Sequence, residues 1–121
     1  MPKKKKMKLK VVGVTFRDEK LGVDRQTVIS TLSGKEKVYL KREPSNRFDE
    51  NAVAVMLYRK GKDFKIGYIR AEVAAFLARF WPKYKFFARI SEIRVGDIEK
   101  KVPYGLSLEI EYSPRRKKAY R

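Results

Sequence analysis

The segment from Ala52 to Tyr58 is a continuous apolar run, the pattern of a strand buried on both faces. Segments with alternating apolar and polar residues surround it, at Lys8–Arg17, Lys37–Arg42, Lys65–Ile69, Tyr84–Val95 and Tyr104–Tyr112. Such alternation predicts half-buried strands. A short chain with this many strands has few ways to bury their apolar faces, so we expect antiparallel strands packed around one core.

Two segments have helical spacing instead. Val73, Ala74 and Leu77 fall on one helical face within residues 71–81, and Pro82 ends that helix. Asp24 is a candidate N-cap for a shorter helix that runs through Leu32. The predicted fold is mainly β with helical insertions (α+β): a six-stranded, partly open antiparallel β-barrel like the oligonucleotide-binding folds, with one or two short helices.

The charge of the chain is unevenly distributed. With 31 Lys plus Arg and 14 Asp plus Glu, the net charge is +17, and residues 1–10 and 115–121 contribute +11 of it without any acidic residue. Runs of like charge repel and bury nothing, so we expect disordered basic arms at residues 1–8 and 113–121 around a folded domain at 9–112. These arms either attract a polyanion such as DNA or serve solubility alone.

The residue types that are missing exclude several functions. The chain has no Cys and no His, which excludes zinc fingers, thiol nucleophiles and Ser-His-Asp hydrolysis. We therefore expect no catalytic residues, no metal and no cofactor. No apolar stretch approaches the roughly 18 residues of a membrane span, so the expected location is intracellular, cytoplasmic or in the nucleoid of a prokaryote. Scarce Asn and Gln beside abundant Lys are typical of proteins that work at high temperature.

The most specific motif is the stretch from Arg42 to Val55, R-E-P-S-N-R-F-D-E-N-A-V-A-V, followed by Gly67-Tyr68-Ile69. Together with the opening V-G-V-T-F of residues 12–16, it resembles the HIRAN domain family over residues 9–112. The resemblance implies a module that binds single-stranded DNA and, in fork-remodelling helicases, captures a free 3′-hydroxyl end. Phe16 then occupies an aromatic position, while Phe48 and Asp49 match a pair that stacks on the terminal base and accepts a hydrogen bond from the hydroxyl.

The chemistry of these residue types suits such a role. A carboxylate repels phosphate but accepts a hydrogen bond from a hydroxyl, so Asp49 can distinguish a 3′-hydroxyl from a 3′-phosphate. Aromatic side chains stack on any base. The Tyr68 hydroxyl and the Tyr104 ring are further candidates. So are the cations that would follow the DNA backbone, which are Arg17, Arg25, Arg47 and Arg70.

Each candidate also has a structural alternative. Asp49 can instead cap its own turn, Asn46 and Asn51 suit turn hydrogen bonds, and Phe48, Tyr68 and Tyr104 can pack in or beside the core. The chain departs from the helicase-type members at Thr15, where they have Arg, and at Ala71, where they have Lys. The loss of two phosphate contacts weakens the case for 3′-end specificity more than the case for DNA binding.

The sequence thus predicts a monomeric, non-enzymatic DNA-binding module that acts in repair or fork processing beside a separate helicase, nuclease or remodelling ATPase. One alternative is a small Mg²⁺-dependent nuclease that uses Glu43, Asp49 and Glu50. Another is a protein-interaction adaptor that only its tails tether to nucleic acid. Stacking and phosphate contacts do not separate RNA from DNA, so RNA stays open as a ligand.

Overall fold

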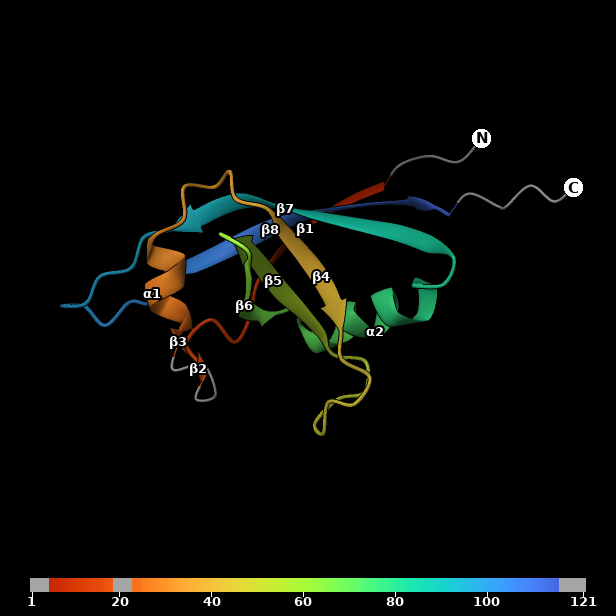
Figure 1. Cartoon of the computed structure of the whole chain (residues 1–121), viewed down its shortest axis with the longest axis horizontal. Coiled ribbons are helices and arrows are strands. Elements are labelled where there is room, and N and C mark those ends of the chain that lie inside the picture. The colour runs from red at the N-terminus through yellow and green to blue at the C-terminus, as the bar shows by residue number, and fades with distance from the viewer. Residues whose placement is uncertain (1–4, 19–22, 116–121) are drawn as a thin grey trace, which may run out of the picture.

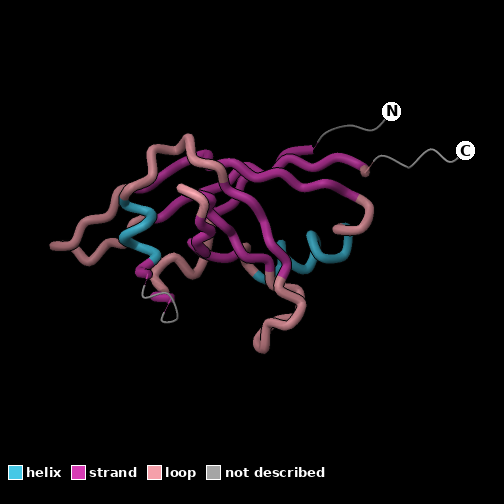
Figure 2. The backbone as a smooth tube through the Cα atoms, viewed as in Figure 1, coloured by secondary structure: helices cyan, strands magenta, loops and turns pink. Residues whose placement is uncertain are grey.

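A computed structural model describes residues 5–18 and 23–115 of the chain. The elements follow in the order β1 (Lys5–Lys10), β2 (Arg17–Asp18), β3 (Val23–Asp24), α1 (Arg25–Ser30), β4 (Val38–Arg42), β5 (Val53–Arg59), β6 (Lys62–Tyr68), α2 (Ala71–Phe80), β7 (Tyr84–Arg94) and β8 (Gly105–Pro114). Figure 2 shows how strands dominate the chain, with the two helices at opposite ends of the fold. The predicted mainly β fold with two helical insertions is therefore confirmed.

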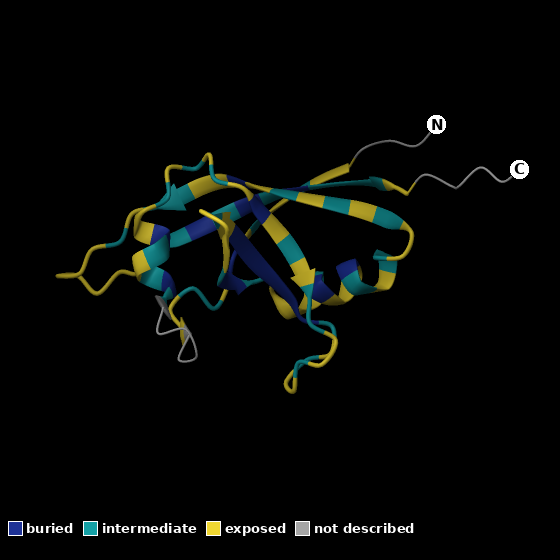
Figure 3. Cartoon of the chain, viewed as in Figure 1, coloured by how far each residue is buried: buried dark blue, intermediate teal, exposed yellow. Residues whose placement is uncertain are grey.

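Two three-stranded antiparallel sheets, β1-β8-β7 and β4-β5-β6, make up most of the fold (Figure 1). The core contains apolar side chains of both sheets, among them Val55 and Leu57 of β5 and Leu108 and Ile110 of β8, all fully buried. As Figure 3 shows, β5 is buried along most of its length, as its continuous apolar run predicted. Strands β1, β7 and β8 thus turn alternate residues to the core, whereas β5 is buried on both faces over residues 53–57.

The six-stranded barrel is not confirmed. One joint between the sheets is the isolated bridge between Val12 and Tyr68, whose backbone groups exchange hydrogen bonds of 2.9 and 2.8 Å. On the other side β4 and β7 lie against one another, but within residues 5–18 and 23–115 they form no hydrogen-bonded ladder. The strands therefore form two packed sheets rather than one closed surface.

The predicted single strand at Lys8–Arg17 is wrong. The chain changes sheets within it: the Val11 N–H donates to the Leu106 carbonyl, and the next residue, Val12, pairs with Tyr68 of β6. Gly13 then takes a positive φ of 69°, which a residue with a side chain rarely adopts, and the chain turns toward β2. Alternation continues through this crossing in the sequence, so it does not reveal where one strand ends.

The predicted arm at residues 1–8 is wrong for Lys5–Lys8, which lie in β1 and pair with β8. Met7 and Leu9 pack against the core, and this burial fixes the lysines between them on the solvent side of a strand. At the other end, β8 includes Pro114, and the Arg115 N–H donates to the Lys83 carbonyl at 2.8 Å. The rest of both predicted arms, residues 1–4 and 116–121, lies outside the described residues.

The helix predictions are confirmed with small shifts in their ends. Asp24 is the N-cap of α1, and its carboxylate accepts a hydrogen bond of 2.9 Å from the Gln26 N–H. Helix α2 ends at Phe80, before Pro82. The β5–β6 hairpin turns on Lys60 and Gly61, both at positive φ, as two-residue hairpin turns of this kind require. Neither described helix is long and apolar enough to span a membrane.

Candidate nucleic-acid interface

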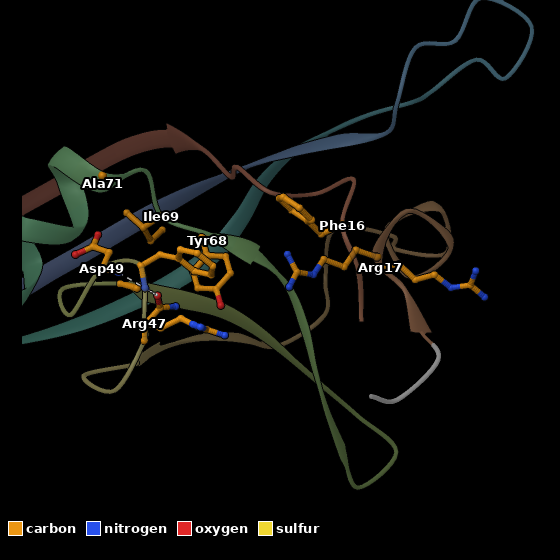
Figure 4. Close-up of a pocket in the computed structure, with 11 residues that line it drawn as sticks. Phe16, Arg17, Arg47, Asp49, Tyr68, Ile69 and Ala71 are labelled. Carbon is orange, nitrogen blue, oxygen red and sulfur yellow. Dashed lines mark hydrogen bonds between the residues drawn. The ribbon is translucent and has the colours of Figure 1, made fainter. Parts of the chain in front are cut away.

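A cavity of about 460 Å³ lies where the loop before β2, helix α1, the turn between β4 and β5, and the end of β6 meet. Its size falls within the range of ligand-binding pockets, roughly 300–1,000 Å³. In Figure 4, Asp49 and Arg47 lie to one side of Tyr68, and Phe16 and Arg17 lie to the other. The lining residues are Phe16, Arg17, Arg25, Asn46, Arg47, Phe48, Asp49, Ala52, Tyr68, Ile69 and Ala71.

Gly67 brings the first of these segments close to β6. A Cβ atom at this position would lie 2.4 Å from Cγ1 of Val11 and 2.7 Å from the Val12 carbonyl oxygen. Only glycine therefore lets the N-terminal segment cross β6 closely enough to form the Val12–Tyr68 bridge. This crossing delivers Phe16 and Arg17 to the pocket and explains the glycine before Tyr68 in physical terms.

Arg25 is buried in the wall of the pocket, with 7% of its surface exposed. Its Nη1 donates a hydrogen bond of 2.7 Å to the Gly13 carbonyl, and its guanidinium lies 5.9 Å from the ring centre of Phe16 and 5.6 Å from that of Tyr68. Among the side chains that the structure describes, which exclude those of residues 18–23, no carboxylate lies within ion-pairing distance of it, and its Nε has no hydrogen-bond partner. A buried positive charge without a counter-charge favours an anionic ligand.

The turn between β4 and β5 is held by its own side chains. Asn46 Oδ1 accepts hydrogen bonds from the backbone N–H groups of Phe48 and Asp49, at 2.9 and 3.1 Å. Asp49 Oδ1 accepts one of 2.8 Å from the Asn51 N–H. Asp49 therefore does cap its turn, but its Oδ2 has no hydrogen-bond partner among the described residues and stays available at the half-buried edge of the pocket.

Two of the pocket's aromatic rings are presented to solvent. Phe48 is 92% exposed and Phe16 66% exposed, so the alternative of core packing for Phe48 is wrong. The Arg47 guanidinium lies 5.8 Å from the ring centre of Phe48. Because both rings line the same pocket, they offer it two apolar faces on which planar ligand groups can stack.

The hydroxyl of Tyr68 is engaged inside the protein rather than free for a phosphate. It donates a hydrogen bond of 2.7 Å to Glu43 Oε1 and accepts one of 2.9 Å from Lys65 Nζ, while Glu43 pairs with Lys65. Burial opposes ionisation of Glu43, but the hydrogen bonds from Lys65, Tyr68 and Asn46 outweigh it and lower the pKa of this carboxyl. Burial likewise opposes the charge of Lys65, and its bonds to Glu43 and Tyr68 nevertheless raise its pKa.

This network fixes the Tyr68 ring and the turn together, because Asn46 Nδ2 also donates to Glu43 Oε1, at 3.0 Å. Glu43 and Lys65 are thus positioning residues that the sequence analysis missed. Glu43 lies in the R-E-P motif, directly before Pro44 and the rest of the turn. This position in the motif was the signal in the sequence that Glu43 belongs to the site.

Seven of the nine predicted site residues line the pocket, and two do not. Tyr104 lies outside it: its ring packs against the core and its backbone exchanges hydrogen bonds with the Gln26 side chain. Arg70 is exposed at the N-cap of α2, next to the pocket residues Ile69 and Ala71, and lies 3.7 Å from Glu72. Of the two departures from the family pattern, Ala71 lines the pocket and Thr15 does not.

The carboxylates of the proposed nuclease do not form a metal site. Across the part of the chain that the structure describes, no group of three acidic side chains is placed to hold a metal ion. Glu43 is committed to Lys65 and Tyr68, and Glu50 is exposed and is not a lining residue. The three carboxylates named for a nuclease are therefore not gathered at one point of the described structure.

Comparisons with known proteins identify the family and the fold of the chain. The family model of the HIRAN domain matches residues 5–113. No curated protein matches the chain at a significant level. Among solved structures, the crystal structure of the HIRAN domain of human HLTF matches with a TM-score of 0.60 and 18% identity, covering 92% of this chain and 77% of that one. At this identity the structural likeness concerns the fold alone.

Proposed function

The chain belongs to the HIRAN domain family, whose members are nucleic-acid-binding modules, and we propose that it binds single-stranded DNA in the pocket between Phe16 and Asp49. The end of a strand with a free 3′-hydroxyl is the proposed ligand. The module acts without catalysis of its own, in DNA repair or fork processing, beside an ATPase, helicase or nuclease carried by a separate protein.

The observation that carries this proposal is the buried Arg25 in the wall of a pocket that also presents two exposed rings, Phe16 and Phe48. Arg25 has no ion-pair partner among the side chains that the structure describes, which exclude those of residues 18–23, and Arg17 and Arg47 add further positive charge around the same cavity. A phosphate would supply the counter-charge, and Phe16 and Phe48 offer faces for the neighbouring bases. The combination of anion site and stacking rings is what a nucleotide needs and what an acidic peptide does not.

Asp49 supports selection of the strand end. It is the one carboxylate that lines the pocket as described. Its free Oδ2 accepts a hydrogen bond from a hydroxyl and repels the two negative charges of a terminal phosphate. An internal nucleotide offers no free 3′-hydroxyl, so the same carboxylate also disfavours binding in the middle of a strand.

The test compares oligonucleotides that differ only at the 3′ end. Fluorescence anisotropy of the full chain with a 3′-hydroxyl strand and a 3′-phosphate strand measures the preference, and an RNA strand of the same sequence tests for the sugar. We expect the hydroxyl end to bind more tightly, and Asp49→Asn to remove that preference while keeping an oxygen for the Asn51 N–H. Equal affinity of the unaltered protein for both ends would contradict end recognition, even where both strands bind.

A further inference from the structure

The face of the β1-β8-β7 sheet that points away from the core carries charges and a ring that the pocket does not use. On β1, Lys6, Lys8 and Lys10 alternate with residues packed against the core. On β7, Lys85, Phe87 and Arg89 are exposed, and Figure 3 shows this alternation along the strand. We call the surface formed by these six residues the outer face. None of these six residues lines the pocket.

The strand register arranges the outer face in rows. Lys6 lies opposite Glu111, and Glu111 lies opposite Phe87 on its other side. In the next row Glu109 has Lys8 on one side and Arg89 on the other. Each row therefore runs from a lysine on the sheet edge, across a carboxylate, to β7. Phe87 is 58% exposed among charged neighbours, which makes it a ring with an accessible face on a sheet.

The surplus charge of this face belongs to its lysines. Arg89 donates to Glu109 Oε1 through Nε at 2.9 Å and Nη2 at 2.6 Å, and Arg94 pairs with Glu92 at 2.7 Å farther along β7. Glu111 is the remaining carboxylate of these strands. Among the described residues, no carboxylate lies within ion-pairing distance of Lys6, Lys8, Lys10 or Lys85. Four lysines thus face solvent against one unpaired carboxylate.

We propose that the outer face is a second binding surface for single-stranded DNA, separate from the pocket. The lysines of β1 repeat every two residues, about 6.8 Å along the strand, and form a row of cations that a phosphate backbone can follow. The bases then point across β8, where carboxylates repel phosphates but accept hydrogen bonds from base N–H groups. Phe87 lies at the end of this path and stacks on a base.

Charge complementarity argues for a nucleic acid here, and the exposed ring of Phe87 argues against attraction by charge alone. A ligand that offers negative charge alone would bind best to cations with no carboxylates between them. The outer face instead separates its lysine row from its aromatic ring by a carboxylate, which matches a polymer with phosphates on one side and bases on the other. With both surfaces occupied, one molecule holds two segments of DNA.

The test uses a circular single strand, which has no 3′ end and so does not depend on the proposed function of the pocket. In fluorescence anisotropy with the full chain, Phe87→Ala should weaken binding of the circle about fivefold or more, as the loss of one stacked base predicts. Phe87→Leu, which keeps apolar bulk, should behave in the same way. The matched control is Tyr58→Ala, because Tyr58 is 51% exposed and lies outside both surfaces. Unchanged affinity in Phe87→Ala and Phe87→Leu would overturn the proposal.

The lysine row is tested by the salt dependence of the same binding. Changing Lys6, Lys8 and Lys10 together to Gln should lower the slope of log affinity against log salt by about 2, since each phosphate contact on a single strand contributes about 0.7. The control changes three exposed lysines elsewhere to Gln: Lys37, Lys60 and Lys62. An equal decrease of the salt slope in both triple variants would show attraction by charge alone and overturn the proposal. Displacement of the circle by poly-glutamate at equal charge would do the same. Loss of the 3′-hydroxyl preference with normal binding of the circle would instead contradict only the function of the pocket.

Discussion

The hydroxyl of Tyr68 lies 2.7 Å from Glu43 Oε1, to which it donates a hydrogen bond across the gap between β6 and the end of β4. Through this carboxylate the ring of Tyr68 is tied to Asn46 and so to the turn that carries Phe48 and Asp49. The Tyr68 ring and the backbone that carries Phe48 and Asp49 are therefore held in place before any ligand arrives. Preorganisation of this kind lowers the entropic cost of binding.

Replacing Glu43 by Gln should destabilise the fold and loosen the pocket. Lys65 would lose its counter-charge in a half-buried position, and we expect a loss of about 1–3 kcal/mol in the free energy of unfolding. Urea denaturation measures this loss. Tyr68→Phe is the matched control, because it removes the hydroxyl and keeps the Glu43–Lys65 pair; a loss as large as that of Glu43→Gln would contradict the central role of the carboxylate.

The stability of the fold should fall in acid partly because of Glu43. Its pKa in the folded state is lowered, with burial opposing and the hydrogen bonds from Lys65, Tyr68 and Asn46 prevailing. The contribution is therefore complete above the pKa of the unfolded chain, about 4.3, and is lost as the pH falls through the lower folded value. Urea unfolding between pH 7 and pH 3 should show a smaller decrease for Glu43→Gln than for the unaltered protein. Parallel curves would exclude this linkage.

Arg25 should contribute to affinity for DNA through one phosphate. Arg25→Met keeps much of the side-chain volume and removes the buried charge, so we expect weaker binding of single-stranded DNA and a salt slope lower by about 0.7. Lys60→Gln at the β5–β6 hairpin serves as the control cation. Thermal unfolding of Arg25→Met shows whether the fold is kept; a folded variant with unchanged salt slope would mean that Arg25 meets no phosphate.

Phe48 should matter for binding and not for stability. The ring is 92% exposed, so Phe48→Ala should leave the urea midpoint nearly unchanged. Affinity for a 3′-hydroxyl strand should fall by about 1–3 kcal/mol through the loss of one stacked base. Titration of the variant with the labelled strand measures this, and an unchanged dissociation constant would place the strand end elsewhere.

Gly67→Ala should be among the most damaging single-methyl changes in the chain. The added Cβ would lie 2.4 Å from the Val11 side chain and 2.7 Å from the Val12 carbonyl, so the crossing segment must shift. Overpacking of this kind costs about 1–3 kcal/mol or more. Gly61→Ala is the comparison, since Gly61 has a positive φ of 77° but open space around it. A smaller loss for Gly67→Ala than for Gly61→Ala, by chemical denaturation, would contradict the steric explanation.

The sequence predicted the strands and helices where burial is periodic. Helix α2 shows this, because it buries a face whose spacing is visible in the chain. Strand β5 was predicted instead from its uninterrupted apolar run. The prediction failed where one apolar pattern spans two sheets, at the crossing between Val11 and Val12. It also failed at Lys5–Lys8, where the run of lysines predicted a disordered arm. The segment is a strand because Met7 and Leu9 pack against the core.

The site was predicted less completely than the fold, because residue type does not reveal which atoms are already engaged. Resemblance to a family placed Phe48 and Asp49 correctly in one turn. Nothing in the sequence indicates that the Tyr68 hydroxyl donates a hydrogen bond to Glu43. Nor does it indicate that Tyr104 faces the core, or that Arg25 is buried beside two rings. These outcomes depend on contacts between residues that are far apart in the chain.

The antiparallel pairing of β1 with β8 places Lys5 directly opposite Tyr112. The start of β1 and the end of β8 are therefore neighbours in one sheet, and Figure 1 shows them on the same side of the fold. A fold with this topology can be spliced into a surface loop of a host protein without forcing the ends of that loop apart. The domain is then inserted as one unit and is joined to the host protein through two adjacent strands, in place of a single flexible linker.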